Sequence, residues 1–191
     1  TKLTGRFDGN GFRLTHLYID RPAADNVGLF GCVGGAGIIT NTGVIQSNVT
    51  GRNFTGVVAG YNEGTISSCY SNGYLVANSY LGGITGKNDG QSSLRTGKVS
   101  DCYSQAYIAA LAATSRAGGL IGENYYGTVL NCYSSGGVGA LSNGGGLIGN
   151  NSYGTVNSSF WNMETSAQLS SAGGTPVTME RSERASCRER V

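Results

Sequence analysis

The sequence predicts an all-β protein folded as a parallel β-solenoid, in which short strands coil around one axis. Three observations support this fold class. A glycine-rich motif recurs five times, the copies lie near 27 residues apart, and the apolar stretches between glycines are only two to four residues long. Such stretches are too short for amphipathic helices, which need an apolar pattern with a period of 3.6 residues. The 33 glycines among 191 residues suit a chain with many tight turns.

The copies of the motif set the length of one coil. They read VGLFG, GVVAG, GGITG, GGLIG and GGLIG and close on Gly31, Gly60, Gly86, Gly122 and Gly149, at spacings of 29, 26, 36 and 27 residues. The long spacing contains an insertion, QSSLRTGK, at 91–98. A coil of two or three short strands fits this period, whereas helical repeats of roughly 33–47 residues and propeller blades of roughly 40 do not. We expect about six coils, stacked about 4.8 Å apart.

Equivalent positions of successive coils should lie above one another and form columns. Two apolar columns are predicted: Leu29, Val58, Ile84, Leu120 and Leu147, and then Ile39, Ile66, Val99, Val129 and Val156. A third column consists of Asn62, Asn88, Asn124 and Asn151. We expect it at a corner, because asparagine tolerates the left-handed conformation and its amide can bond along the stack. One coil cannot bury its own apolar face, so the repetition itself stabilises the fold.

The segments on both sides of the repeat continue the pattern. Residues 5–19, GRFDGNGFRLTHLYI, read as an earlier coil with a turn at DGNG. Its expected core is Phe7, Phe12, Leu14, Leu17 and Ile19. Residues 160–179, FWNMETSAQLSSAGGTPVTM, form either a further coil or an incomplete cap. The segments 45–54, 73–80 and 104–117 are expected to be variable loops that present binding surface.

The charge distribution separates the last eleven residues from the rest. RSERASCRERV, at 181–191, carries four arginines and two glutamates and holds the whole net charge of +2. A basic tail can bind nucleic acid, but this stretch lacks the repeat and reads as translated vector sequence. We therefore place the solenoid at 1–180, a non-native or disordered tail at 181–191, and expect no nucleic-acid partner. The sequence contains no apolar run of about 18 residues and so predicts no membrane span. The opening residues read as part of a longer chain.

The residues after each motif carry a family resemblance. Three coils continue with Cys-Tyr-Ser, at 69–71, 102–104 and 132–134, and Gly-Thr followed by a β-branched residue precedes two of these. The flanks FDGNG, NVGLFG and SFWNMETSAQLSSAGGT accompany them. Over roughly 5–180 the chain resembles the GLUG-motif repeat family. The resemblance implies a segment of a large secreted or surface-exposed bacterial protein. Such segments occur in adhesin-like proteins and beside protease domains of the immunoglobulin-A-peptidase type, and the family supplies no catalytic residues to carry over.

The histidine and the cysteines form no recognisable catalytic or zinc motif. His16 is the only histidine, and we expect it in a half-buried structural position because no nucleophile-elbow or HExxH motif accompanies it. The cysteines are Cys32, Cys69, Cys102, Cys132 and Cys187, without a CxxC pair. Three of them share a column, which we interpret as small buried thiols in the core. Parallel Cβ vectors disfavour a disulfide between stacked neighbours.

Two further columns bear on ligand binding. Tyr70, Tyr103 and Tyr133 follow the cysteines, and Phe160 takes the same place in the last coil. A core or corner-packing role is favoured, because phenylalanine lacks the hydroxyl, and an exposed stripe that stacks on sugar rings is the alternative. Thr65, Thr128 and Thr155 form a threonine column. This single column is broken by Lys98, which disfavours an ice-binding array.

The acidic residues give one hypothesis about chemistry. Glu63 and Asp89 both follow the column asparagine in successive coils, so their carboxylates can share a cation. The basic residues near them in sequence are Lys87, Arg95 and Lys98. Carboxylates that hold Ca²⁺ beside a basic residue would suit a polysaccharide lyase. The third acid, Glu123, is out of phase with the other two.

These observations favour a non-catalytic solenoid of a large secreted or cell-surface bacterial protein, acting as an adhesive or spacer stalk. A host or environmental glycan or protein is the expected partner. The alternatives are a carbohydrate-active β-helix enzyme of the polysaccharide-lyase type and a glycan- or ice-binding module. We expect no catalytic residue, no cofactor and no metal ion.

Overall fold

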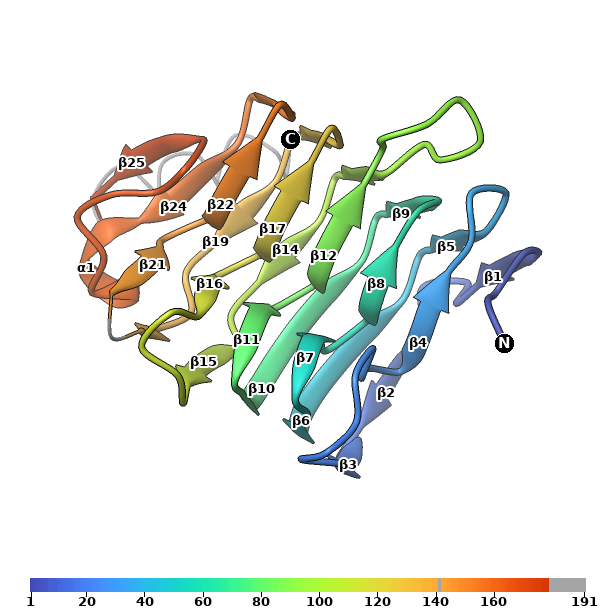
Figure 1. Ribbon diagram of the computed structural model, residues 1–191. Coiled ribbons are helices and arrows are strands. Elements are labelled where there is room, and N and C mark those ends of the chain that lie inside the picture. Colours follow the sequence, from blue (N-terminus) through green and yellow to red (C-terminus); the bar gives the residue numbers. More distant parts are fainter. Residues whose placement is uncertain (141, 179–191) are drawn as a thin grey trace.

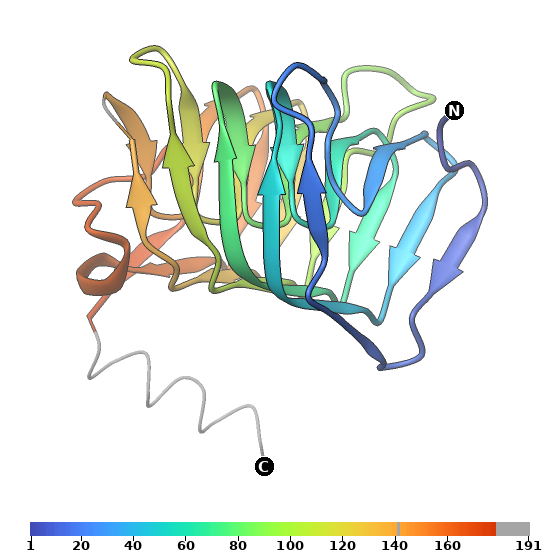
Figure 2. The same cartoon turned by 90° about the horizontal axis from the view of Figure 1, so that it is seen from below.

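The computed structural model, described for residues 1–140 and 142–178, is a parallel β-solenoid, so the predicted fold class is confirmed (Figure 1). Neighbouring coils pair in parallel through the middle of the stack. The coils lie side by side, with the N-terminal coil at one end and the C-terminal segment at the other (Figure 2). The predicted tail at 181–191 lies outside the described residues.

Four sheets, which we name A to D, form the walls of the solenoid. Sheet A contains β4 (Phe30–Val33), β8 (Ala59–Asn62), β12 (Thr85–Asp89), β17 (Ile121–Tyr125) and β22 (Ile148–Ser152). Sheet B contains β1 (Arg6–Asp8), β5 (Ile38–Thr40), β9 (Thr65–Ser67), β13 (Lys98–Ser100), β18 (Thr128–Leu130) and β23 (Thr155–Asn157). Sheet C contains β2 (Arg13–Thr15), β3 (Tyr18–Asp20), β6 (Gly43–Thr50), β10 (Tyr70–Ala77), β14 (Tyr103–Ser104), β15 (Tyr107–Ala110), β19 (Tyr133–Ser134), β20 (Val138–Gly139), β24 (Phe160–Asn162) and β25 (Thr175–Val177). Sheet D contains β7 (Asn53–Gly56), β11 (Ser79–Gly82), β16 (Arg116–Gly118) and β21 (Asn143–Gly145).

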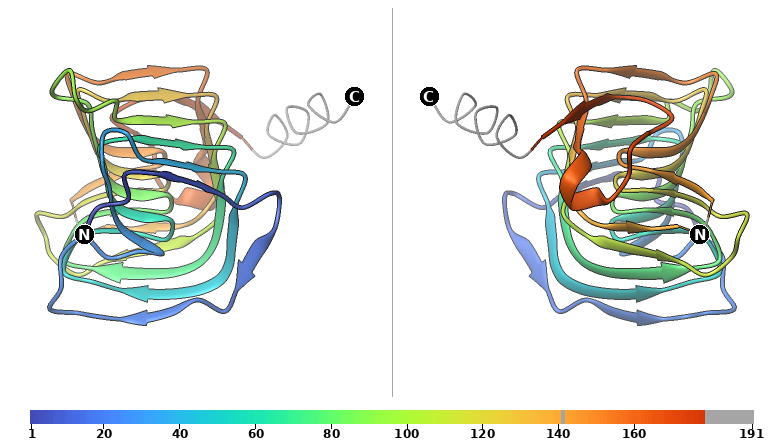
Figure 3. Two further views of the ribbon diagram at one scale, coloured as in Figure 1. Left: turned by 90° about the vertical axis from the view of Figure 1, so that its right-hand side faces the viewer. Right: turned by 90° about the vertical axis from the view of Figure 1, so that its left-hand side faces the viewer.

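Each complete coil passes through sheets B, C, D and A in turn, as β5, β6, β7 and β8 do. The expectation of two or three strands in each coil is therefore wrong. Sheet B has six strands, sheet A five and sheet D four. The stack thus makes about five turns, and strands reach six levels on sheet B and seven on sheet C, where β25 is the last. Figure 3 views the stack from its two ends.

Both predicted apolar columns run through the core. On sheet B, Ile39, Ile66, Val99, Val129 and Val156 follow one another in register. The first four of these are fully buried, and Val156 is half-buried near the C-terminal end. In the other column, Val58, Ile84, Leu120 and Leu147 are fully buried and Leu29 is half-buried. Backbone N–H groups of this column donate to the next coil, from Ile84 to Leu120 at 2.9 Å and from Leu120 to Leu147 at 2.9 Å.

The asparagine column forms a ladder of side-chain amides inside sheet A. The Nδ2 of Asn62 donates to Oδ1 of Asn88 at 2.8 Å, Asn88 donates to Asn124 at 2.8 Å, and Asn124 donates to Asn151 at 2.9 Å. The predicted bonding along the stack is confirmed. The predicted left-handed conformation is wrong for these residues, because they lie at the ends of extended strands. Left-handed residues occupy instead the corner between sheets B and C, at Asn41, Ser68, Asp101, Asn131 and Ser158, with φ between 45° and 55°.

The glycines of the repeated motif lie where sheets D and A approach most closely. A Cβ on Gly86 would lie 2.5 Å from the carbonyl carbon of Phe54 and 2.6 Å from the oxygen of Tyr80. A Cβ on Gly56 would lie 2.6 Å from Cα of Thr85. The chain therefore folds back from sheet D to sheet A with backbone against backbone, which leaves no room for side chains.

The two ends of the stack differ from the middle. Phe7 pairs in register with Ile39, as expected, but Phe12 is 74% exposed, so its assignment to the core is wrong. At the other end α1 (Met163–Ser166) follows β24, and β25 pairs in parallel with β24. Of the two expectations for this segment, a further coil or an incomplete cap, residues 160–178 thus match the cap. In the described part of the chain, no helix is long and apolar enough to cross a membrane.

The segments expected to be variable loops are mostly strand. Residues 45–50 belong to β6 and residues 73–77 belong to β10. In the third segment, β15 and β16 flank a short connection at 111–115. These segments therefore present a flat sheet surface rather than protruding loops.

Candidate functional site

The single histidine lies on the surface rather than in the expected half-buried position. His16 is exposed, has a φ of 58°, and its backbone N–H donates to the oxygen of Ile45 at 3.1 Å. It follows β2 at a bend of the incomplete first coil. The side chain of His16 therefore lies at the N-terminal end of the solenoid and does not pack in the core.

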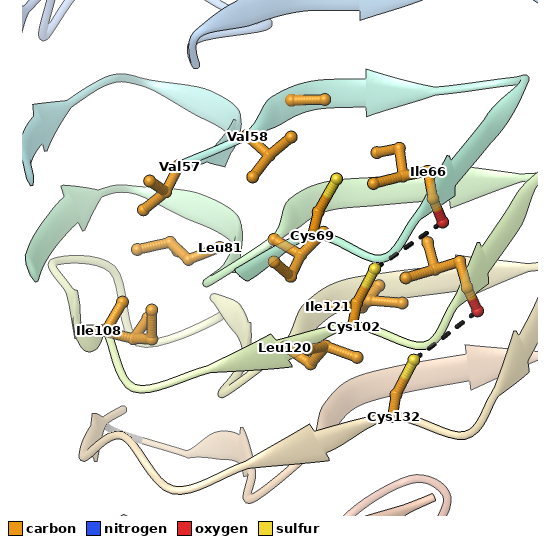
Figure 4. Close-up of a cluster of buried hydrophobic side chains, with 14 of the residues drawn as sticks. Val57, Val58, Ile66, Cys69, Leu81, Cys102, Ile108, Leu120, Ile121 and Cys132 are labelled. Atoms are coloured by element: carbon orange, nitrogen blue, oxygen red, sulfur yellow. Dashed lines mark hydrogen bonds between the residues drawn. The ribbon is translucent and has the colours of Figure 1, made fainter. Parts of the chain in front are cut away.

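The cysteine column is confirmed and lies in the core beside the apolar columns (Figure 4). Cys69, Cys102 and Cys132 are buried and carry free thiols. Each Sγ contacts a carbonyl oxygen of its own coil, at 3.1 Å from Ser67, 3.0 Å from Ser100 and 3.2 Å from Leu130. Burial raises the pKa of the Cys102 thiol well above its usual value, which keeps this sulfur protonated and unreactive.

The two remaining cysteines do not join the column. Cys32 lies in β4, is half-buried, and faces Tyr61 across sheet A. Cys187 lies outside the described residues. Ser159 takes the column position in the last coil and donates to the oxygen of Asn157 at 2.7 Å. A hydroxyl can therefore replace the thiol, which supports a space-filling role for the column.

The structure brings Glu63 and Asp89 together through one arginine. Arg95, on the insertion, places Nε 3.3 Å from Oε1 of Glu63 and Nη1 2.8 Å from Oδ2 of Asp89. Lys2 contacts Glu63 at 2.6 Å, and the hydroxyl of Tyr61 donates to Asp89. Burial and the bond to Asp89 raise the pKa of Tyr61. The predicted proximity of the two carboxylates is thus observed, with the guanidinium in the place that the hypothesis gave to a metal cation.

The insertion reaches this position by folding back over two earlier coils. A Cβ on Gly35 would lie 2.8 Å from the carbonyl carbon of Leu94, so the loop rests directly on that corner. The hydroxyl of Thr96 donates to the oxygen of Gly35 at 3.3 Å. Lys98 begins β13 in sheet B and lies outside the carboxylate cluster. The loop therefore acts as a strap that Arg95 fastens to the side of the stack.

Glu123, the third acid, has a separate set of partners, as expected from its different position in the repeat. Glu123 contacts Lys87 at 3.2 Å and Arg116 at 2.7 Å, and Nδ2 of Asn150 donates to it at 3.1 Å. Lys87 also lies over the ring of Tyr125, 4.6 Å from its centroid. Residues 1–140 and 142–178 include no group of three or more histidine, cysteine or acidic side chains placed to hold a metal ion. The carboxylates of Glu63, Asp89 and Glu123 thus each lie against a lysine or an arginine along sheet A.

Aromatic side chains form two rows on the outer face of sheet C. The first row is the predicted column, in which the rings of Tyr70 and Tyr103 stack at 5.1 Å with an interplanar angle of 5°. Tyr103 is 42% exposed and Phe160 40%, so the favoured core position is wrong for this column. The second row was not predicted: Tyr74 and Tyr107 stack at 5.3 Å and 2°. Its signal in the sequence is the repeated spacing of four residues, from 70 to 74 and from 103 to 107.

The threonine column lies on the outer face of sheet B and is interrupted as predicted. Thr65 pairs in register with Lys98, Lys98 with Thr128, and Thr128 with Thr155. Ile38 occupies the same position in the preceding coil. A single mixed column of this kind does not make the flat threonine array that an ice-binding surface would need.

Comparisons with known proteins agree with the repeat and its fold. The model of the GLUG motif matches residues 113–139, so the resemblance to that motif is confirmed there. Halomucin of Haloquadratum walsbyi (strain DSM 16790 / HBSQ001) is 40% identical over 91 residues, which are 48% of this chain and 1% of Halomucin. The matched segment is thus a very small part of that protein.

A solved structure shares the fold over most of the chain. A Bacteroides ovatus protein described as a candidate immunoglobulin A1 protease aligns with a TM-score of 0.69 at 21% identity. The alignment covers 93% of this chain and 70% of that chain. At this level of identity the likeness concerns the fold alone.

Proposed function

We propose that this chain, a β-solenoid with a GLUG repeat, is a non-catalytic stalk segment of a large secreted or cell-surface protein. The observation that carries the proposal is the continuous parallel register of the repeat through the stack. Each coil adds about 4.8 Å to a stiff rod, so the segment separates or displays whatever adjoins it. The similarity to Halomucin supports a surface or secreted location, and adhesive function and bacterial origin belong to the same proposal.

A carbohydrate-active enzyme of the lyase type is the weaker candidate. Glu63, Asp89 and Glu123 each have a lysine or arginine partner. A lyase needs a carboxylate cluster open to a cation and a base beside the substrate, and here Arg95 spans the two carboxylates. The pairing therefore favours a structural role for these charges.

Immunolabelling of the source cells tests the surface location. Antibodies raised against the purified chain are applied to intact and to permeabilised cells, and intact cells are also treated with an external protease. We expect labelling of intact cells or of the culture medium, with loss of the cell-bound signal after protease treatment. Labelling that requires permeabilisation would contradict the proposal.

A separate assay tests the absence of catalysis. The purified chain is incubated with immunoglobulin A1 and with neutral and acidic polysaccharides, and the products are followed by gel electrophoresis and by reducing-sugar release. We expect no turnover with or without added Ca²⁺. Turnover that is lost in Glu63→Gln and Asp89→Asn would establish the enzyme instead.

A further inference from the structure

The outer face of sheet C carries a row of aromatic side chains that spans four coils. Five of its rings are at least 40% exposed, and Tyr70 and Tyr133 are half-buried beside them. The exposed five are Tyr18, Tyr74, Tyr103, Tyr107 and Phe160, and Tyr18 lies at the N-terminal edge in register with Asn48. In the first row Tyr70, Tyr103, Tyr133 and Phe160 follow one another in register across four coils. Rows of this length on a flat sheet are unusual for a surface that contacts only water.

The rings lie across the sheet instead of standing away from it. A Cβ on Gly43 would lie 2.5 Å from Cε1 of Tyr70, so this ring covers the glycine of the neighbouring coil. A Cβ on Gly137 would lie 2.8 Å from Cδ2 of Tyr107, so that ring covers a glycine in the opposite direction. The glycines and rings together make a continuous, low surface that extends along the stack.

The same face carries no charge in its central coils. The other residues that point outward from β6, β10, β14, β15, β19 and their flanks are Ile45, Gln46, Asn48, Thr50, Asn72, Val76, Gln105, Ala109 and Ser135. They offer amide and hydroxyl groups next to the rings. The ion pairs described above lie along sheet A and its flanks. A nucleic acid or an acidic polysaccharide would need cations that the central coils of this face lack.

We propose that this face, which we term the tyrosine face, binds a neutral polysaccharide laid along the rows. Aromatic rings contact the apolar C–H faces of sugars, and amides exchange hydrogen bonds with their hydroxyls. The groups recur with every coil, about 4.8 Å apart, close to the advance of an extended sugar chain per residue. The flat surface suits a polymer, because a small ligand would need a concave pocket. The inference rests on the proposed adhesive stalk and names its ligand class.

Affinity electrophoresis of the purified chain tests this proposal. Native gels contain mixed-linkage β-glucan, galactomannan or amylopectin as neutral probes and polygalacturonate as the acidic probe. We expect retardation in at least one neutral polymer and none in polygalacturonate. The double variant Tyr103→Ser/Tyr107→Ser should bind about ten-fold more weakly, because it removes one ring from each row. Tyr153→Ser, which removes a ring that is 77% exposed on another side, is the matched control and should bind normally.

A second variant separates binding from folding. Gln105 is exposed between the two rows, so Gln105→Glu keeps the fold while it adds a charge to the face. It should reduce retardation at neutral pH. Migration unchanged by all three neutral polymers, retardation in polygalacturonate alone, or equal loss in the Tyr153→Ser control would overturn the proposal. Surface labelling of cells is independent of these gels, so a failure here would leave the proposed stalk standing.

Discussion

At the residue scale, the asparagine ladder is the polar feature on which the interior most depends. Asn88 lies in its middle, fully buried, and donates to the oxygen of Gly97 at 2.6 Å as well as to Asn124. Because water does not reach this position, each amide depends on the coils above and below for its partners. The ladder thus fixes the register between coils, which apolar contacts alone would allow to slip.

Replacement of Asn88 by alanine should therefore destabilise the protein strongly. The change leaves Asn62 only the oxygens of Gly64 and Lys98 as acceptors and takes the donor from the buried Oδ1 of Asn124. We expect a cost of about 2–4 kcal/mol in the free energy of unfolding. Urea denaturation, monitored by circular dichroism, measures this loss of stability. Asn151→Ala, at the half-buried end of the ladder, should cost clearly less. Equal costs at the two positions would show that the ladder adds nothing beyond local packing.

Asp8 gives the clearest dependence of stability on pH. Hydrogen bonds from Arg6, from the backbone N–H of Asn10 and from Asn41 lower the pKa of Asp8 from 3.8 to about 2. Because the folded-state pKa lies below the unfolded value, the carboxylate stabilises the fold above pH 3.8, and this contribution disappears as the pH falls toward about 2.

The comparison of Asp8→Asn with the unchanged protein isolates this group. Thermal unfolding between pH 6 and pH 2 should show the variant less stable at the upper end and the difference shrinking below pH 3.8. The other carboxyl groups are common to both proteins and cancel. A difference that stays constant over the whole range would exclude Asp8 as its source.

At the scale of elements, the arch between sheets D and A explains the glycine motif. Gly86→Ala should lower the free energy of unfolding by about 2–3 kcal/mol, because the new methyl group must displace the backbone of Phe54 and Tyr80. Gly5→Ala is the control, since nothing lies within 4 Å of a Cβ there, and it should stay within about 0.5 kcal/mol. The same urea titration measures the free energy of unfolding of both variants. An unchanged free energy of unfolding in Gly86→Ala would mean that the backbone around Gly86 leaves more room than the structure shows.

The strap at 91–97 depends on Arg95. Arg95→Gln removes the ion pairs with Glu63 and Asp89 but leaves Lys2 on the first and Tyr61 on the second. Because the arginine side chain is 36% exposed, global stability should fall by only about 1 kcal/mol or less. Hydrogen exchange of the strap should become faster. Arg52→Gln, which breaks the exposed pair with Asp25, should leave the strap unchanged. Unaltered exchange in Arg95→Gln would show that backbone contacts hold the strap.

At the scale of the whole molecule, the period and the order of apolar residues were enough to predict the solenoid, both core columns and the cysteine column. They did not reveal four strands in each coil, because left-handed corners at residues such as Ser68 and Asp101 carry no strong sequence signal. The sequence placed Arg95 near the two acids but did not reveal that it bridges them, because Glu63 comes from the preceding coil. The exposure of Tyr103 could not be read from a column of three tyrosines and one phenylalanine, because both residues suit a core and a surface row.

The two ends of the stack predict how the isolated chain associates. The C-terminal end is covered in part: β25 pairs with β24, and Gly146 donates to the oxygen of Ser170 at 3.0 Å, while β23 ends sheet B. At the N-terminal end, β1 and β2 each have a strand neighbour on one side only among the described residues. Unpaired edges of this kind recruit other strands. Because the C-terminal segment shields much of the other end, association should pair two N-terminal ends and stop at the dimer instead of growing into fibres.

Sedimentation velocity over a range of concentrations tests this association, and Thr15→Pro tests its location. The N–H of His16 donates inward to Ile45, so by the alternation of a strand the N–H of Thr15 points to the open edge. Proline there removes an edge donor and spares the internal ladder. We expect dimers at high concentration for the unchanged chain and for Thr15→Ala, and monomers for Thr15→Pro. Dimers that persist in Thr15→Pro would place the contact elsewhere, and larger species would show that the C-terminal cap does not protect its end.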